Sequence, residues 1–219
     1  MIPGARLIIV GRQGAGKGTQ CVRLSRHYVV PHISTGDMLR AAVREGSELG
    51  RTAAEVMDSG SLVSDEIMIG IVRERLGRDD ARTRGYILDG FPRTVAQAEA
   101  LDEITAERPI QCVIDLNVPR DLVLQRISSR RVCRDCGTNY TTTGKEKQPW
   151  LCDVCGGDVV LRDDDTPDAV NRRLDLYESQ TRPLIEYYSR RDRLAVIDGV
   201  GHPDEVFARL TAAVEAART

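Results

Sequence analysis

A glycine-rich segment close to the start of the chain constrains the fold more than any other feature. Residues 11–20 read GRQGAGKGTQ and follow the apolar run ARLIIV. This order predicts a buried strand over Arg6–Val10, a tight turn, and a helix over Lys17–Tyr28. Glycines let such a turn aim backbone N–H groups at an anion, and the helix N-terminus adds its positive dipole. The segment therefore predicts a phosphate-binding loop from which Lys17 reaches the terminal phosphates.

The rest of the chain alternates short apolar runs with helical patterns. GYILDG (85–90), QCVIDLNV (111–118) and LAVIDG (194–199) predict further strands, and residues 94–106, 120–129, 168–190 and 204–217 predict helices. Thr166 before Pro167 predicts a capped helix start, and Val22 and Leu24 are expected to face inward. This alternation predicts an α/β fold with a parallel sheet covered on both faces. Residues 34–64 hold helical patterns without a strand, which indicates a helical lobe inserted between strands.

Composition excludes several classes of function. The 219 residues suffice for one sizeable core, and 31 basic against 33 acidic side chains leave a net charge of −2. This balance argues against general binding to nucleic acid or to an anionic membrane. No apolar run approaches the roughly 20 residues that span a bilayer, and the start MIPGARLIIV does not resemble a signal peptide. We expect a cytoplasmic protein whose six cysteines bind metal or stay free, without disulfides.

Four of the cysteines form two copies of one short motif, CRDCG and CDVCG. Their spacing, Cys133-x2-Cys136-x15-Cys152-x2-Cys155, is typical of a four-thiolate zinc site. Four thiolates leave no ligand position for a catalytic water, so the predicted role is structural, ordering a segment too small for its own core. The alternative is a set of reduced cysteines without metal. Cys21 and Cys112 lie in apolar patterns and are expected to be core thiols.

The hydroxyl of the phosphate loop comes one residue later than in the common motif, at Thr19 after Gly18. The resulting pattern, GxxGxGKGT, is similar to the loop of adenylate kinases and related nucleotide kinases. The chain resembles them from end to end, through ISTGDMLR (33–40), DGFPRTVAQ (89–97), RRV (130–132), LRDDD (161–165) and the final IDG (197–199). Gln13 stands where the family often has proline, although the backbone donors of the loop do not depend on that side chain. Zinc-bearing lids occur in a subset of the long-lid members.

The resemblance implies a fold in three parts and a reaction. A P-loop kinase core would comprise residues 1–33, 64–129 and 166–219, with an AMP-binding insert over 34–63 and a zinc-bearing lid over 130–165. The implied activity is reversible transfer of the terminal phosphoryl group from ATP to AMP, giving two ADP. The resemblance further implies dependence on Mg²⁺, lid closure that excludes water from the reaction, and a monomer.

Site residues follow from the matching motifs. Phosphoryl transfer demands positioning and neutralisation of charge, for which the guanidinium fork of arginine is suited. The phosphate of a nucleoside monophosphate needs no general base because its second pKa is about 6, and the three histidines follow no catalytic pattern. Asp89 would orient Mg²⁺ through water. The catalytic group implied by the resemblance is Lys17, Asp89, Arg93, Arg130, Arg162 and Arg173. The implied ATP-binding residues are Gly14, Ala15, Gly16, Lys17, Gly18, Thr19, Arg130, Asn139, Tyr140 and Gly201. Those implied for AMP are Thr35, Arg40, Ser61, Leu62, Val63, Gly90, Phe91, Pro92, Arg93, Gln97, Arg162 and Arg173.

Two other functions stay open at this point. A sister nucleotide kinase would use GTP as donor or another monophosphate as acceptor. A P-loop switch or RNA-binding protein would grip RNA with its zinc knuckles. Against the latter, the knuckle region ends in the acidic run Asp163, Asp164 and Asp165, and a second nucleotide site has no purpose in a switch protein.

Overall fold

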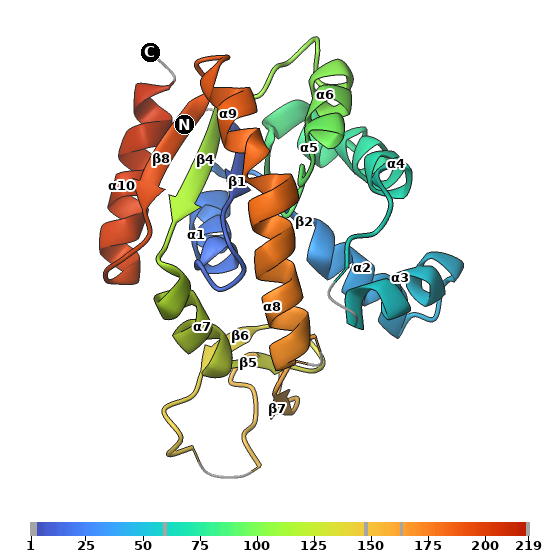
Figure 1. The fold of residues 1–219 in the computed structure, drawn as a ribbon, viewed down its shortest axis with the longest axis vertical. Helices are drawn as coiled ribbons and strands as arrows, with labels where there is room; N and C mark the ends of the chain where they lie inside the picture. The colour runs from blue at the N-terminus through green and yellow to red at the C-terminus, as the bar shows by residue number, and fades with distance from the viewer. Residues whose placement is uncertain (1–3, 59–60, 147–148, 163, 218–219) are drawn as a thin grey trace.

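Five parallel strands form the central sheet of the computed structural model, which describes residues 4–58, 61–146, 149–162 and 164–217. Their order is β2 (His32–Ser34), β3 (Tyr86–Asp89), β1 (Arg6–Val10), β4 (Cys112–Asn117) and β8 (Leu194–Asp198). In the centre, Ile8 is in register with Leu88 on one side and Val113 on the other (Figure 1). The predicted parallel α/β sheet is confirmed. The sequence pattern missed β2, whose three residues are too few to show a period.

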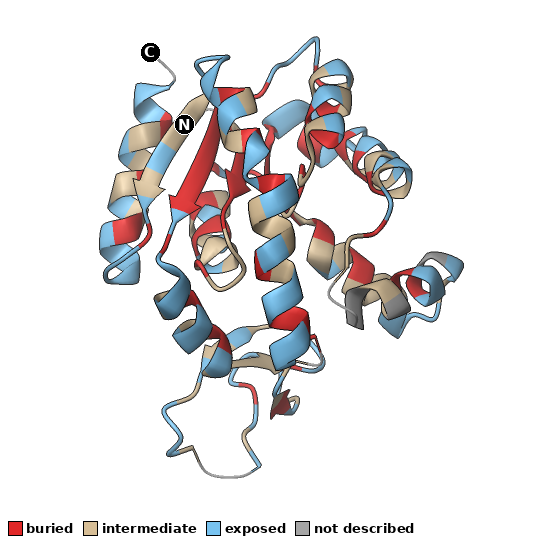
Figure 2. Ribbon diagram, viewed as in Figure 1, coloured by how far each residue is buried: buried red, intermediate tan, exposed pale blue. Residues whose placement is uncertain are grey.

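Helices cover both faces of this sheet, as the near-continuous apolar strands require. Leu7 and Ile9 of β1 face one core, built with α1 (Lys17–Tyr28), α7 (Arg120–Ser128), α8 (Pro167–Leu176) and α10 (Pro203–Ala216). Ile8 and Val10 face the other, built with α2 (Thr35–Arg44), α4 (Asp65–Leu76), α6 (Val95–Ile104) and α9 (Pro183–Ser189). Each fully buried Leu or Ile contributes roughly 1.5–3 kcal/mol. The middle strands are accordingly the most buried part of the ribbon (Figure 2).

Helix α1 begins and ends where the sequence predicts, but one of its inward residues was assigned wrongly. Leu24 is fully buried, whereas Val22 keeps 42% of its surface exposed. The buried face of α1 carries Cys21, Leu24 and Tyr28, which are spaced three and four residues apart. Val22 lies two positions from Leu24, about 200° around the helix, so the two cannot share a face.

The single helix expected over residues 168–190 is also wrong, because a π-helical segment interrupts it. Helix α8 starts as predicted, with the Thr166 hydroxyl accepting the N–H of Ala169 at 3.3 Å. Tyr177–Thr181 then widens into a π-helical turn in which Arg182 N–H donates to Tyr177 O, five residues back, at 2.8 Å. Pro183 has no N–H to continue the ordinary pattern, and α9 begins there.

Two groups of elements project from the sheet near its carboxyl edge (Figure 1). One is the helical pair α2 and α3 (Glu48–Asp58). The other is a small antiparallel sheet of β5 (Arg130–Cys133), β6 (Asn139–Thr141) and β7 (Val159–Val160), which the sequence did not predict. A short helix, α5 (Asp79–Arg84), precedes β3. Across the described ranges, no helix has the length and apolar character that crossing a membrane requires.

Candidate nucleotide-binding site

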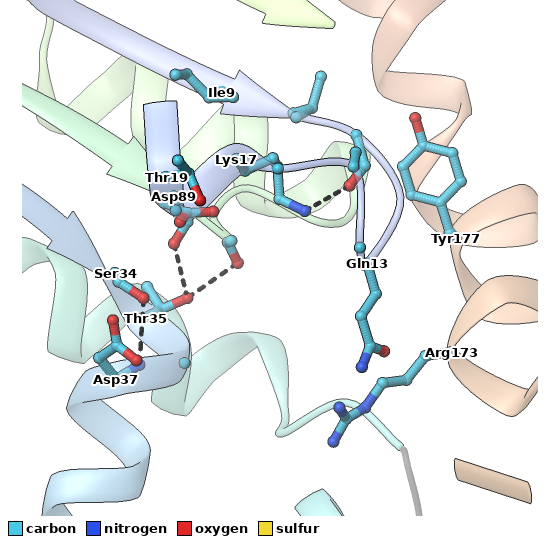
Figure 3. Close-up of a pocket in the computed structure, with 18 of the residues that line it drawn as sticks. Ile9, Gln13, Lys17, Thr19, Ser34, Thr35, Asp37, Asp89, Arg173 and Tyr177 are labelled. Carbon is cyan, nitrogen blue, oxygen red and sulfur yellow. Dashed lines mark hydrogen bonds between the residues drawn. The ribbon is translucent and has the colours of Figure 1, made fainter. Parts of the chain in front are cut away.

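The glycine-rich loop joins β1 to α1 in the conformation that its sequence predicts. Gly11, Gly14 and Gly16 have φ of 141°, 81° and 100°, a region that favours glycine. A Cβ on Gly14 would also approach Ile127 Cγ1 to 2.8 Å, so α7 packs directly against the loop. Lys17 folds back over the loop and donates to the carbonyl oxygens of Gly11 at 2.8 Å and Arg12 at 3.0 Å (Figure 3). The ammonium group is thus held inside the loop.

Asp89 lies beside this lysine at the carboxyl end of β3. Burial lowers the pKa of Lys17, an effect that the Asp89 charge opposes. Burial alone would raise the pKa of Asp89, but a hydrogen bond from His32 and the charges of Lys17 and Arg93 hold it below 3.8. His32 Nε2 lies 3.3 Å from Asp89 Oδ2. With Cys21, these two side chains form one of the two groups of potential metal ligands among the described residues, and the hydrogen bond orients the Asp89 carboxylate.

A cluster of arginines surrounds one buried carboxylate, Asp164. Its oxygens lie 2.8 Å from Arg162 Nε, 3.0 Å from Arg173 Nη2 and 3.7 Å from Arg40 Nη1. Burial alone would raise the pKa of Asp164, but the three guanidinium groups outweigh it and lower the pKa. Arg162 and Arg173 are near Asp164 in the sequence, whereas Arg40 comes from the distant helix α2, so the fold brings it to the same carboxylate.

The arginines of this region lie so close together that the charge of each disfavours the charged form of its neighbours. Burial and the neighbouring Arg173 lower the pKa of Arg93 to about 10. Burial and Arg40 likewise lower the pKa of Arg162 to about 10. Both groups remain charged at neutral pH, in a place where the positive charges repel one another. An anion that entered here would relieve that repulsion.

On the side of α2, the residues expected to contact AMP are tied to each other. The Thr35 hydroxyl donates to Gly90 O at 3.0 Å (Figure 3). Gln97 Nε2 donates to Asp65 Oδ1 at 2.7 Å, while Gln97 Oε1 accepts the backbone N–H of Arg93 at 2.8 Å. Thr35 and Gln97 are buried, so the fold fixes their polar atoms.

One cavity of about 650 Å³ connects the phosphate loop, the arginine cluster and this region. Every residue predicted for ATP, AMP or catalysis lines it except Phe91, which is 1% exposed and packs in the core. Asn139 and Tyr140 reach it from β6, and Gly201 from the loop after β8. The side chain of Tyr140 also packs on Trp150 and donates to Cys152 Sγ at 3.1 Å. Asp163 of the acidic run and Gly60 of GSLVSD lie outside the described residues.

The four cysteines of the two knuckles converge at the small antiparallel sheet. Their sulfur atoms all lie within 4.8 Å of one another, with Cys133 and Cys155 at 3.4 Å and Cys136 and Cys152 at 3.6 Å. A tetrahedral zinc site with bonds of about 2.3 Å places its sulfurs about 3.8 Å apart, so the donor set fits that ion. Cys21 and Cys112 are buried in the core as free thiols, as expected.

Comparison with known proteins decides the family. The family model for adenylate kinase matches residues 9–193. The chain belongs to the adenylate kinase family. It is 51% identical to the adenylate kinase of Moorella thermoacetica over 197 residues, 89% of this chain and 90% of the relative. It is 48% identical to that of Bacillus subtilis over 205 residues, 92% and 94% of the two chains. It is 46% identical to that of Thermodesulfovibrio yellowstonii over 213 residues, 96% and 99% of the two.

Adenylate kinases move the terminal phosphoryl group of ATP to AMP and form two ADP, so this chain is an enzyme of phosphoryl transfer. Membership in a family of enzymes supports the kinase interpretation over the hypothesis of a P-loop switch protein. Sequence reasoning assigned no role to several polar residues in and around this cavity. Asp65, the last residue of GSLVSD, lies beside the cavity lining and accepts from Gln97 Nε2. Asp164 lines the cavity; it was matched within LRDDD but otherwise considered only as negative charge against RNA binding. Arg126 donates to Ala15 O at 3.1 Å and Gly199 O at 3.2 Å, and no motif identified it.

Proposed function

We propose that this chain carries out the adenylate kinase reaction as a Mg²⁺-dependent transfer inside a cavity that its lid closes. The observation that carries the proposal is the single cavity in which the phosphate loop meets six arginines, Arg40, Arg93, Arg126, Arg130, Arg162 and Arg173. Two polyphosphates meeting there would bring together many negative charges. Without compensating cations, their repulsion would prevent the approach of the reacting oxygen and phosphorus atoms.

The donor side consists of the loop and the residues that meet it. Backbone N–H groups of Gly14 to Thr19 would hold the β- and γ-phosphates at the N-terminus of α1. The Lys17 ammonium would leave the carbonyls of Gly11 and Arg12 for phosphate oxygens, where its charge is most needed as the bond to the leaving ADP breaks. Arg130 would act on the same side.

On the acceptor side, Thr35, Gln97 and the backbone of residues 61–63 would hold the adenine of AMP, with Gly90, Phe91 and Pro92 beside them. The phosphate of AMP would take over the arginines that Asp164 holds, and Arg93 would contact it as well. This phosphate attacks directly because it is already ionised at neutral pH. The site residues need to orient it and neutralise it, and no proton has to be removed.

Oxygen ligands for Mg²⁺ are available where the phosphates would lie. Asp89 Oδ2 is close to Gly18, at 3.8 Å from the position that a Cβ there would take, and its lowered pKa keeps it ionised. Carboxylate oxygen suits Mg²⁺, which usually keeps several waters as well. When bound, the ion would neutralise phosphate charge. Asp89 would hold its water shell, with His32 fixing the carboxylate.

We also infer the division of the chain into parts. Residues 1–33, 64–129 and 166–219 form the core, residues 34–63 the AMP-binding insert, and residues 130–165 a lid that closes over both nucleotides. Closure would exclude water, which otherwise competes with AMP for the phosphoryl group.

Zinc on Cys133, Cys136, Cys152 and Cys155 would order the lid without taking part in the reaction. We further propose a cytoplasmic monomer whose partners are ATP, AMP and ADP, and not nucleic acid or membrane.

The test is a coupled assay of diphosphate formation across ATP and GTP as donors and several monophosphates as acceptors. The proposal expects ATP with AMP to give the highest kcat/KM, and no turnover without Mg²⁺. A higher kcat/KM with GTP, or with a monophosphate other than AMP, would identify a sister nucleotide kinase instead.

A further inference from the structure

Gln13, the residue of the phosphate loop that departs from the family pattern, makes a specific contact outside the loop. Its Nε2 donates to Asp165 Oδ1 at 2.7 Å. Asp165 in turn holds Arg130 through both oxygens, with Arg130 Nε at 2.8 Å from Oδ2 and Nη2 at 2.5 Å from Oδ1. The Asp165 side chain has no exposed surface. A continuous polar chain therefore runs from the phosphate loop to the two residues at which segment 130–165 begins and ends.

The orientation of the Gln13 amide follows from its partner. An ionised carboxylate only accepts hydrogen bonds, so the NH₂ group must face Asp165. The carbonyl Oε1 is buried and has no hydrogen-bond partner in the described part of the chain. Gln13 also lines the nucleotide cavity, and it extends from the loop toward Arg173 (Figure 3). Because a buried carbonyl without a partner is unfavourable, the contact with Asp165 is what holds this side chain in place.

The loop does not need this contact to keep its own shape. Arg12, the preceding residue, donates to Glu178 Oε1 at 2.9 Å and to Val118 O at 3.1 Å. Arg126 donates to Ala15 O from α7. These bonds and the glycine backbone fix the loop from the side of the core. What Gln13 adds is a link in the other direction, to the carboxylate that orients Arg130.

We propose that Gln13 is a positioning residue that holds Arg130 at the donor phosphates by way of Asp165. The inference rests on the donor-side role proposed above for Arg130. Without Gln13, the Asp165–Arg130 pair keeps its mutual bonds but loses its tie to the loop, and the pair is free to move with the lid. With Gln13, the loop that binds the phosphates also fixes the guanidinium that must reach them.

The first experiment compares Gln13→Ala, Arg130→Ala and the double variant of the full-length protein by steady-state kinetics. Gln13→Ala should lower kcat/KM for ATP about tenfold and leave the KM for AMP unchanged. In the Arg130→Ala background, Gln13→Ala should change kcat/KM by less than about twofold, because the residue it positions is gone. Gln125→Ala, an exposed glutamine on α7, is the matched control and should resemble the parent.

A second variant, Gln13→Glu, separates positioning from simple packing. Among the described residues, the charged groups near position 13 are Asp165, Arg130 and, from α8, Arg173. An ionised carboxylate there repels Asp165, whereas its protonated form donates a hydrogen bond as the amide does. Two carboxyl groups this close cannot easily both be ionised, which raises the pKa of one of them above its ordinary value. Activity of Gln13→Glu relative to the parent should therefore rise as the pH falls from 8 to 6. A residue that only packs would give a ratio independent of pH.

The outcomes are distinct. A full tenfold loss from Gln13→Ala in the Arg130→Ala background, or a flat pH ratio for Gln13→Glu, would overturn the inference while leaving the proposed function intact. An Arg130→Ala variant with the parent's ATP kinetics would overturn the donor-side role of Arg130 and, with it, the inference. If Gln13→Ala affects only the ATP kinetics of the parent, and adds no further loss in the Arg130→Ala background, the results support both the inference and the proposed role of Arg130.

Discussion

Replacing Asp164 by asparagine tests how the arginine cluster is held together. Asp164→Asn keeps the shape of the side chain and removes the carboxylate charge that lies against Arg162, Arg173 and Arg40. Removing one partner from a buried ion pair costs about 3–5 kcal/mol. Asp164 exposes only 7% of its side chain, but the arginines expose 16–25%, so solvent screens part of the repulsion. We therefore expect a loss of about 3 kcal/mol in the free energy of unfolding.

That loss has a characteristic dependence on ligand and on pH. For a chain of this length, about 3 kcal/mol lowers Tm by roughly 6–12 °C. Bound AMP should restore much of the lost stability, since its phosphate replaces the missing carboxylate. If half of the lost free energy of unfolding is recovered when AMP binds, AMP binds roughly tenfold more tightly to the variant than to the parent. Because the folded pKa of Asp164 lies below 3.8, its contribution is complete above the pKa of the unfolded chain. The contribution disappears as the pH falls through the folded pKa, so the two proteins should converge only at a pH below the ordinary titration range of an aspartate.

The assay is calorimetric unfolding of parent and variant from pH 3 to 8, with and without AMP, together with titration calorimetry of AMP binding. Arg82, an exposed arginine paired with exposed Asp79 on α5, provides the control. Asp79→Asn should change Tm by less than about 4 °C, because exposed pairs contribute about 0–1 kcal/mol. An Asp164→Asn protein as stable as the parent at pH 7, with AMP binding no tighter, would refute the reasoning.

Three further predictions address the rest of the site. Lys17→Ala should lower turnover by at least about a hundredfold in the coupled assay while Tm stays near that of the parent, because the ammonium acts on the transferring charge; near-parental turnover would remove the phosphate-loop assignment. Arg93→Lys should lower kcat and raise the KM for AMP, since lysine lacks the bidentate fork, and an effect on ATP alone would move Arg93 to the donor site. Removing the lid metal with a chelator, or making Cys133→Ser, should lower Tm yet leave the initial rate at low temperature, because Lys17, Asp89 and Arg93 belong to the core; a stable protein without activity would mean that the metal does chemistry.

The sequence predicts the architecture of this protein well wherever a pattern is long or a motif is dense. Apolar or periodic patterns are clear enough to predict strands β1, β3, β4 and β8 and helix α1. The spacing of the four cysteines likewise predicts that they lie together. The failures are local. Val22 was misplaced because an apolar residue next to a buried one need not share its helix face, and the break at Tyr177–Thr181 depends on Pro183 within an otherwise helical pattern.

The candidate site divides in the same way. Lys17, Arg93 and Gln97 could be predicted because each lies in a motif that is continuous in the sequence. Asp164 contacts Arg40, Arg126 contacts Ala15 and His32 contacts Asp89, and the two partners in each of these pairs lie far apart in the sequence. No local periodicity records such contacts. They become visible only when the sheet brings the ends of its strands to one edge.

The small core of the knuckle region has a practical consequence. Trp150 is the only tryptophan of the chain, and it packs against Tyr140 with ring centroids 5.4 Å apart, beside Cys133, Cys152 and Val159. Its indole emission therefore originates wholly outside the central sheet. The unlabelled protein therefore carries an intrinsic fluorescent reporter of this one region. Excitation at the red edge of the tryptophan absorption band would follow the order of the region, while the rest of the chain, which has no tryptophan, does not emit.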